Sequence, residues 1–220
     1  MNCTISSLHY CPVKSVSFQT IDSCEIKKNI GIVGDRNFAF SKDLDTNKAM
    51  LFEKSPEERK GKWNKILTLK NSPVLNKYNF LFKNDNLTLT FEDKKVLTID
   101  INENSERQKL VNKIIELESS LKEPIVLMRN KEFPFFDTSV SKKVDFVNSV
   151  SLLNIQSIND FQDKIDKNIE TSRFRGNIYV DGIKAWEERN WIGKIIKINN
   201  VSFKVEKNIP RCVAINLKPK

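Results

Sequence analysis

The chain has 220 residues, enough for one large domain or two small ones with a sizeable hydrophobic core. A hydrophobic content of 39%, with 14 Phe, excludes a disordered protein, and no apolar run reaches the roughly 20 residues that a membrane-spanning helix needs. The formal net charge of +9 favours anionic partners, and because no secretory signal is recognisable we expect a soluble, cytoplasmic protein.

Short segments of alternating apolar and polar residues dominate the sequence. In chain order, we expect a strand at 37–40, a helical turn after Pro56, a β-hairpin of residues 87–91 and 96–101, and a helix that Asn104 or Ser105 caps and that reaches Leu121. Next come a short helix capped by Ser157, a segment at 171–180 that is read as extended, a helix from Ala185 to Trp191, a hairpin of 194–198 and 201–205, and a final strand at 211–217. The predicted fold class is therefore mainly β with a few helices.

The helix that carries Leu110 and Leu121 divides two strand-rich halves, which indicates a boundary near residues 103–125. We therefore predict two closely packed β units, residues 1–112 and residues 113–220. The alternative is one continuous β-rich domain with the helix packed across it.

The cysteines do not form a zinc or disulfide pattern. The sequence has no C-x-x-C pair and a single histidine, His9; its cysteines are Cys3, Cys11, Cys24 and Cys212. In a strand at 211–217, Cys212 would face away from the apolar side formed by Val213, Ile215 and Leu217. This position indicates a functional thiol, and the alternative is an ordinary structural cysteine.

Two basic segments indicate an anion site. If residues 171–180 are extended, Arg173, Arg175 and Asn177 share one face, and two neighbouring guanidiniums favour a phosphate or carboxylate between them. The alternative is a solvated edge strand. Near the start of the chain, Lys14 and Ser15 follow a proline, and Arg36 follows a Gly-Asp turn, so each could also contact an oxyanion.

Six short motifs then occur in one order. They are P-V-K-S at 12–15, G-D-R-N-F at 34–38, F-F-D at 135–137, S-L-L-N at 151–154, R-F-R-G-N at 173–177 and R-C at 211–212. With this set the sequence resembles the MOSC (molybdenum cofactor sulfurase C-terminal) domain family, in the branch with an N-terminal MOSC-associated domain that includes amidoxime-reducing components. The resemblance implies a MOSC-type β-barrel packed with a smaller N-terminal β-rich domain.

The resemblance also implies a cofactor and its ligands. The cofactor would be the molybdenum cofactor (molybdopterin), with Cys212 as the metal ligand and catalytic residue, since a thiolate suits a metal already held by sulfur. The matching cofactor-binding positions are Lys14, Ser15, Arg36, Arg173, Arg175, Asn177 and Arg211. Asp137 is either a further polar residue of this site or the carboxylate of a turn.

The implied function is a molybdenum-dependent oxidoreductase that reduces N-hydroxylated or related oxygenated small molecules. No cysteine pattern for an iron–sulfur centre is present, so the electrons would come from a separate protein with an iron–sulfur, flavin or haem centre. The alternative is a cofactor carrier or binding module without turnover. A nucleic-acid-binding barrel is disfavoured, because the sequence lacks a compact basic and aromatic motif.

Two features depart from the family pattern. Gly176 stands where relatives usually have proline, which we expect to loosen the segment that positions Arg175 and Asn177. The sequence also continues for only eight residues beyond Cys212 (220 − 212), whereas relatives run on further. We therefore expect a C-terminally short barrel in which the strand at 211–217 is an exposed edge.

Overall fold

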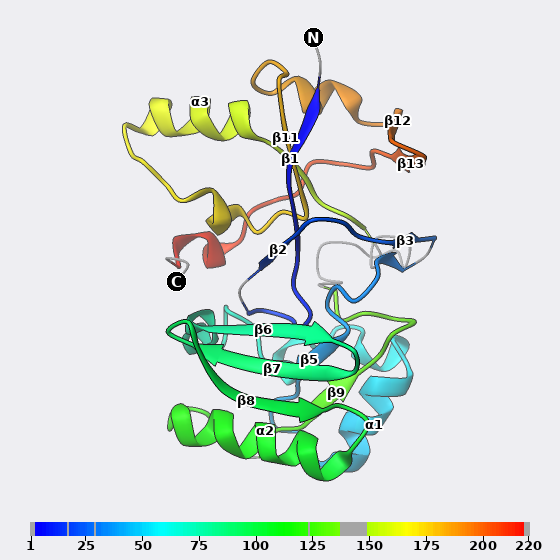
Figure 1. Cartoon of the computed structure of the whole chain (residues 1–220), viewed down its shortest axis with the longest axis vertical. Coiled ribbons are helices and arrows are strands. Elements are labelled where there is room, and N and C mark those ends of the chain that lie inside the picture. Colours follow the sequence, from blue (N-terminus) through cyan, green and yellow to red (C-terminus); the bar gives the residue numbers. More distant parts are fainter. Residues whose placement is uncertain (1–2, 17, 29, 123, 137–148, 218–220) are drawn as a thin grey trace.

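The computed structural model describes residues 3–16, 18–28, 30–122, 124–136 and 149–217. These residues form two lobes, one above the other in Figure 1. The N-terminal strand β1 (Thr4–Tyr10) runs down through the upper lobe toward the lower one. Within the described part of the chain, no helix has the length and apolarity to cross a membrane.

The lower lobe is built on an antiparallel three-stranded sheet. Its strands, in spatial order, are β6 (Tyr78–Lys83), β7 (Asn86–Phe91) and β8 (Lys94–Asp100). Glu92 and Asp93 have φ values of 50° and 59°, as a tight turn between twisted strands requires, and the predicted hairpin is confirmed. Helix α2 (Asn104–Leu117) packs against β8 and buries Leu110, Val111 and Ile114 in the main hydrophobic core.

The rest of the lower lobe covers this core from the other side. Its elements are β5 (Phe38–Phe40), α1 (Thr46–Lys54), three 3₁₀ turns (Glu57–Arg59, Trp63–Lys65 and Pro73–Lys77) and β9 (Leu127–Arg129). β5 pairs antiparallel with β9, and Phe38 and Phe40 are buried. The predicted strand at 37–40 and the helical turn after Pro56 are thus confirmed. The chain just before β5 is thereby anchored in the core.

The upper lobe contains a four-stranded sheet made from both ends of the sequence. Its order is β10 (Leu152–Asn154), β11 (Ile178–Asp181), β1 and β2 (Gln19–Ile21). β11 pairs antiparallel with β1 and parallel with β10. The predicted division of the chain into residues 1–112 and 113–220 stays a prediction, and the sheet itself joins strands from both ranges.

Smaller elements complete the upper lobe. They are the strand pair β3 (Ile26–Lys27) and β4 (Gly31–Ile32), helix α3 (Ile155–Ile165), the 3₁₀ turns Thr171–Phe174, Glu187–Trp191 and Val213–Asn216, and the hairpin of β12 (Ile195–Ile198) and β13 (Val201–Lys204). Asn199 has a φ of 51° at the hairpin turn, so the prediction of a hairpin about this position is confirmed.

The predicted fold class needs correction. Helices and strands occur in comparable amounts, so the fold is mixed α and β rather than mainly β. The described strands form separate sheets of two to four strands, and these sheets do not close into a barrel within that part of the chain. Much of the additional helix is in short 3₁₀ turns, which lack the apolar periodicity that reveals a long helix in a sequence.

The helix boundaries also differ in detail. Helix α2 has Glu103 as its N-cap, one residue before the predicted candidates, and it ends at Leu117 rather than at the predicted Leu121. Helix α3 is capped by Asn154, whose side chain accepts a hydrogen bond from Gln156 N at 3.0 Å. The predicted cap Ser157 instead donates its hydroxyl proton to the Glu188 carboxylate, at 2.7 Å. The predicted helix at 185–191 is a 3₁₀ turn that begins at Glu187.

The prediction of a strand at 211–217 is wrong. Residues Val213–Asn216 form a 3₁₀ turn, for which Cys212 is the N-cap. Ala214 and Leu217, three residues apart, pack against the main core, whereas Val213 is 63% exposed. A spacing of three residues matches the repeat of a 3₁₀ helix, so the short apolar pattern at 213–217 is compatible with both a strand and a 3₁₀ turn. The segment therefore presents no exposed strand edge.

Candidate functional site

The chain that follows β1 forms a tight loop between the two lobes. Phe38 N donates to Pro12 O at 3.0 Å, and Lys14 N donates to Phe38 O at 2.8 Å, so the loop is tied to β5. Lys14 is only 6% exposed, and Ser15 has a φ of 67°. The sharp reversal at Ser15 keeps the following residues close to the loop.

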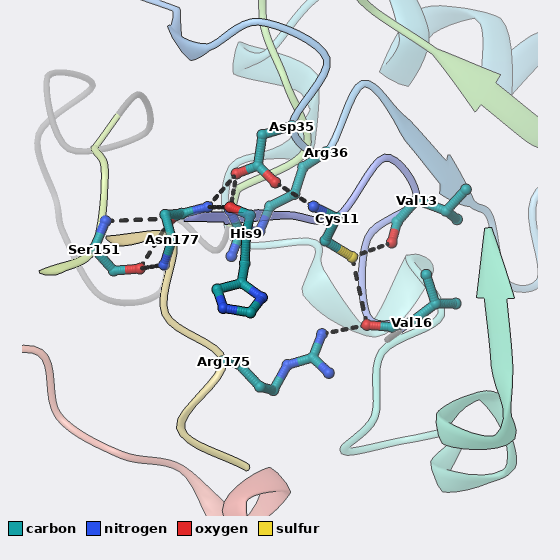
Figure 2. Close-up of polar contacts among 9 residues, drawn as sticks. All are labelled: His9, Cys11, Val13, Val16, Asp35, Arg36, Ser151, Arg175 and Asn177. Carbon is teal, nitrogen blue, oxygen red and sulfur yellow. Dashed lines mark hydrogen bonds and ion pairs between the residues drawn. The ribbon is translucent and has the colours of Figure 1, made fainter. Parts of the chain in front are cut away.

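Cys11 is a structural thiol within this loop. It is completely buried, and its Sγ–H group is 2.8 Å from Val13 O and 3.4 Å from Val16 O (Figure 2). Burial raises the pKa of this thiol above its usual value, although the nearby Arg175 and Arg36 oppose the shift. The hydrogen bonds close the loop around the sulfur.

Asp35 connects three segments of the chain. Its carboxylate is buried, and it accepts hydrogen bonds from Cys11 N at 2.7 Å and from Asn177 Nδ2 at 3.2 Å (Figure 2). It also forms an ion pair with the Arg36 guanidinium. Gly34 precedes it with a φ of 91°, a conformation that glycine adopts without strain. The Gly-Asp-Arg turn thus holds Arg36 at the junction of the lobes.

Asn177 is the second connecting residue. Its Oδ1 accepts from Ser151 N at 3.2 Å and from Ser151 Oγ at 2.9 Å, and its Nδ2 donates to His9 O at 3.2 Å as well as to Asp35. A carboxamide has two donor protons and two acceptor lone pairs, so these four bonds use its capacity. Asn177 therefore joins β1, the turn at Asp35 and the segment at Ser151.

The predicted extended segment at 171–180 is only partly a strand. Residues Thr171–Phe174 form a 3₁₀ turn, Arg175 has a φ of 51°, and β11 begins at Ile178. This turn separates the two arginines, so the expectation that they share one strand face is wrong. Arg173 donates to Glu170 Oε2 at 2.6 Å and to Asn216 O at 3.1 Å, whereas Arg175 donates to Val16 O at 2.6 Å.

Gly176 is tightly packed rather than loose. Its N–H donates to the Tyr179 hydroxyl at 3.2 Å, a bond that proline could not make. A Cβ atom at this position would overlap the Leu153 side chain, with its Cγ at 2.9 Å. The expectation of a loosened segment is therefore wrong, because the missing side chain allows the backbone to approach β10.

Arg36 and Arg175 come together on one aromatic ring. Their guanidinium carbons are 5.1 and 4.9 Å from the centre of the Phe18 ring, and Arg36 is also 4.9 Å from the centre of the Phe136 ring. Burial lowers the pKa of Arg175, and the positive charge of Arg36 lowers it further. The site thus contains two guanidiniums within electrostatic range of each other.

Cys212 lies at the edge of this basic cluster. Its side chain is exposed, but the strand face on which the sequence pattern placed it does not exist, because Cys212 is the N-cap of a 3₁₀ turn. Burial lowers the pKa of both Arg175 and Arg211, and a negative charge at Cys212 would oppose this shift. Arg211 donates to Phe174 O at 2.8 Å. The exposed thiol and the partly buried Arg175 are therefore electrostatically coupled.

The sequence-predicted site residues are thus only partly brought together. Arg36, Arg175 and Cys212 belong to one electrostatic cluster, and Lys14 is in the adjoining loop. Arg173 points to Glu170 and to the turn at 213–216 instead. Asp137 lies outside the described residues. Among those described, no group of three or more His, Cys, Asp or Glu side chains could hold a metal ion.

Sequence reasoning missed two residues of this site. Asp35 was inside a recognised motif, and the signal was its position between a glycine and an arginine. Phe18 carries no such signal, because its contacts with Arg36 and Arg175 depend on the fold.

Comparison with known proteins identifies the family. The model of the MOSC N-terminal beta barrel domain matches residues 2–123, and the model of the MOSC domain matches residues 144–220. The chain therefore belongs to the MOSC family, in the branch with the N-terminal domain, and the resemblance seen in its motifs is confirmed.

A curated relative gives a more particular comparison. The chain is similar to mitochondrial amidoxime reducing component 2 of Bos taurus, with 27% identity over 107 residues. The matched region covers 49% of this chain and 30% of the relative's length.

Proposed function

We propose that this protein binds a molybdenum cofactor of the molybdopterin type at the cluster of Arg36, Arg175 and Cys212. The observation that carries the proposal is the pair of guanidiniums that share the Phe18 ring beside a thiol that is exposed. Of these two positive charges, Asp35 neutralises one. A phosphate or another anionic group would supply the negative charge that the second lacks.

The residues present fit such a group in chemical type. Arg36 and Arg175 are suited to oxyanions, since a guanidinium donates several hydrogen bonds in one plane. The Cys212 thiolate is a soft ligand, which suits molybdenum held by dithiolene sulfur. Arg211 precedes Cys212 in the sequence and adds a further positive charge beside this thiol. Lys14 and Ser15 would contact the cofactor from the loop after β1, a role that rests on the family resemblance alone.

The reaction that we propose is the reduction of N-hydroxylated small molecules. When bound, the cofactor supplies the two-electron chemistry of molybdenum, and the protein supplies the ligand, the orientation and the electrostatic environment. Conversion of an N–OH group to N–H takes up two electrons and two protons and releases water. We infer that the electrons come from a separate electron-transfer protein. The name of the similar bovine protein supports this class of reaction.

The proposal is tested by metal and pterin analysis of protein from a host that makes the cofactor. We expect about one molybdenum and one pterin per chain, and a Cys212→Ala variant should lose the sulfur ligand seen by X-ray absorption at molybdenum. Cys3→Ala is the matched control, because Cys3 is also exposed. Absence of molybdenum and pterin from the wild type would refute the proposal. Bound cofactor without N-hydroxyl reduction would instead favour the carrier function.

A further inference from the structure

Phe18 lies between the two arginines of the proposed site. The residue comes directly before β2, is partly buried, and packs against the main hydrophobic core. Its ring centre is 5.1 Å from the Arg36 guanidinium carbon and 4.9 Å from that of Arg175. Both distances are within the roughly 6 Å at which the negative face of an aromatic ring attracts a cation.

The two arginines would repel each other without a compensating partner. Burial lowers the pKa of Arg175, and the positive charge of Arg36 lowers it further, so both effects oppose this arrangement. Asp35 compensates Arg36 through an ion pair. Arg175 donates to a neutral partner, Val16 O, at 2.6 Å. The Phe18 ring is thus a contact that the two guanidiniums have in common.

We infer that Phe18 is a positioning residue of the anion site, and that its ring holds Arg36 and Arg175 side by side so that both can contact one anionic group. This inference rests on the proposed function for the identity of the anion, whereas the positioning itself concerns the protein alone. The bond from Arg175 to Val16 O engages one of the five N–H donors of the guanidinium, and the ring contact engages its face. The guanidinium edge can therefore donate to a ligand.

The positioning is tested first in protein without cofactor, by NMR of the arginine Nε–Hε groups. In the wild type, the ring current of Phe18 should shift the signals of Arg36 and Arg175 relative to exposed arginines. A Phe18→Leu variant keeps apolar bulk and loses the ring, so the Arg175 signal should move toward ordinary values. The Arg36 signal should move part of the way, because the Phe136 ring still lies against Arg36. A Phe18→Tyr variant keeps the ring and should retain the shifts. Unchanged signals in Phe18→Leu would overturn the inference.

The consequence for binding is tested by pterin content after expression in a host that makes the cofactor. One cation–π contact corresponds to about a twofold to thirtyfold change in an equilibrium constant. Phe18→Leu removes two such contacts, so it should lower the pterin content per chain about tenfold or more. Phe18→Tyr should stay within about twofold of the wild type. The matched control is Phe91→Leu, since Phe91 is a partly buried ring that packs against the Tyr78 ring in the lower lobe, at an angle of 35°.

The outcomes separate this inference from the proposed function. Equal pterin loss in Phe18→Leu and Phe18→Tyr would overturn the positioning role, as would full retention in Phe18→Leu. Absence of pterin from the wild type would refute the proposed function, and the NMR result alone would then decide the positioning of the two arginines. If Phe18→Leu does not fold, the Arg36 and Arg175 signals are measured in Phe18→Tyr and Phe18→Trp instead. Both variants keep an aromatic ring, so both should retain the ring-current shifts. Loss of the shifts in both variants would overturn the inference.

Discussion

Gly176 allows a quantitative test of the packing that positions Arg175 and Asn177. In Gly176→Ala, the new Cβ would be 2.9 Å from Leu153 Cγ and 3.4 Å from Tyr179 Cε2, and it would overlap the end of the Leu153 side chain. Leu153 is paired with Tyr179 in the parallel strands β10 and β11, so the backbone behind it cannot easily retreat. Overpacking of this kind costs about 1–3 kcal/mol, which is the loss of unfolding free energy that we expect.

The cause is isolated by a double-mutant cycle with Leu153→Ala, measured by urea unfolding. Shortening Leu153 removes the overlapping atoms, so Gly176→Ala should cost less than about 0.5 kcal/mol in that background, a coupling of about 1 kcal/mol or more. Gly193 provides the control, since a Cβ there meets nothing within 4 Å, although its φ of 81° makes alanine strained. Gly193→Ala should therefore be additive with Leu153→Ala. A Gly176→Ala variant as stable as the wild type, or an additive pair, would refute the reasoning.

Two further predictions concern the charged groups around the site. Arg175→Ala should lower pterin content about tenfold to a hundredfold, because hydrogen bonds to charged groups are worth about 1.5–3 kcal/mol. Arg173→Ala should have little effect, because Arg173 pairs with Glu170 instead. Equal pterin losses in the two variants would contradict this arrangement of the arginines. Burial lowers the pKa of His9 below 6.5, so the unfolded chain binds more protons and stability should fall as the pH drops below about 6.5. Urea unfolding of His9→Gln should lack this part of the pH dependence, and an identical pH profile would contradict it.

Local sequence signals predicted the hairpins and the long helix well. The turns at Glu92-Asp93 and Asn199-Asn200 are short and polar, and Asp93 and Asn199 adopt the positive φ that Asp and Asn tolerate. Helix α2 spans several turns, so its apolar repeat is unambiguous. These elements depend on contacts between neighbours in the sequence, which a pattern can reveal.

The errors fall where the pattern is short or the backbone turns abruptly. The alternation at 213–217 covers too few residues to distinguish a strand from a 3₁₀ turn, and the side chains at 214 and 217 decide the outcome by packing on the core. The positive φ of Arg175 reverses a segment that reads as extended, and arginine has no special preference for that conformation. Neither outcome follows from residue type.

The candidate site was only partly predictable, for a similar reason. Arg36, Arg175 and Cys212 were identified from an ordered set of motifs. Such a set indicates the family but does not predict the distances between the side chains. The interactions that bring these residues together join segments far apart in the sequence. Examples are the hydrogen bond from Asn177 to Asp35 and the contact of Phe18 with Arg175. Such long-range contacts require the tertiary fold, so Asp35 and Phe18 become visible only in the structure.

The pairing of β1 with β11 has a consequence for the order of folding. Thr4 is opposite Asp181 in this sheet, so most of the chain forms the loop that the pairing closes. Pairs so distant in sequence form slowly, because the entropy of closing the loop is lost before the contacts are gained. During synthesis, β1 must therefore wait for β11 to emerge, while the meander of β6, β7 and β8 can form from local contacts. Arg36 and Arg175 meet only after this late pairing, which makes the anion site one of the last features of the molecule to assemble.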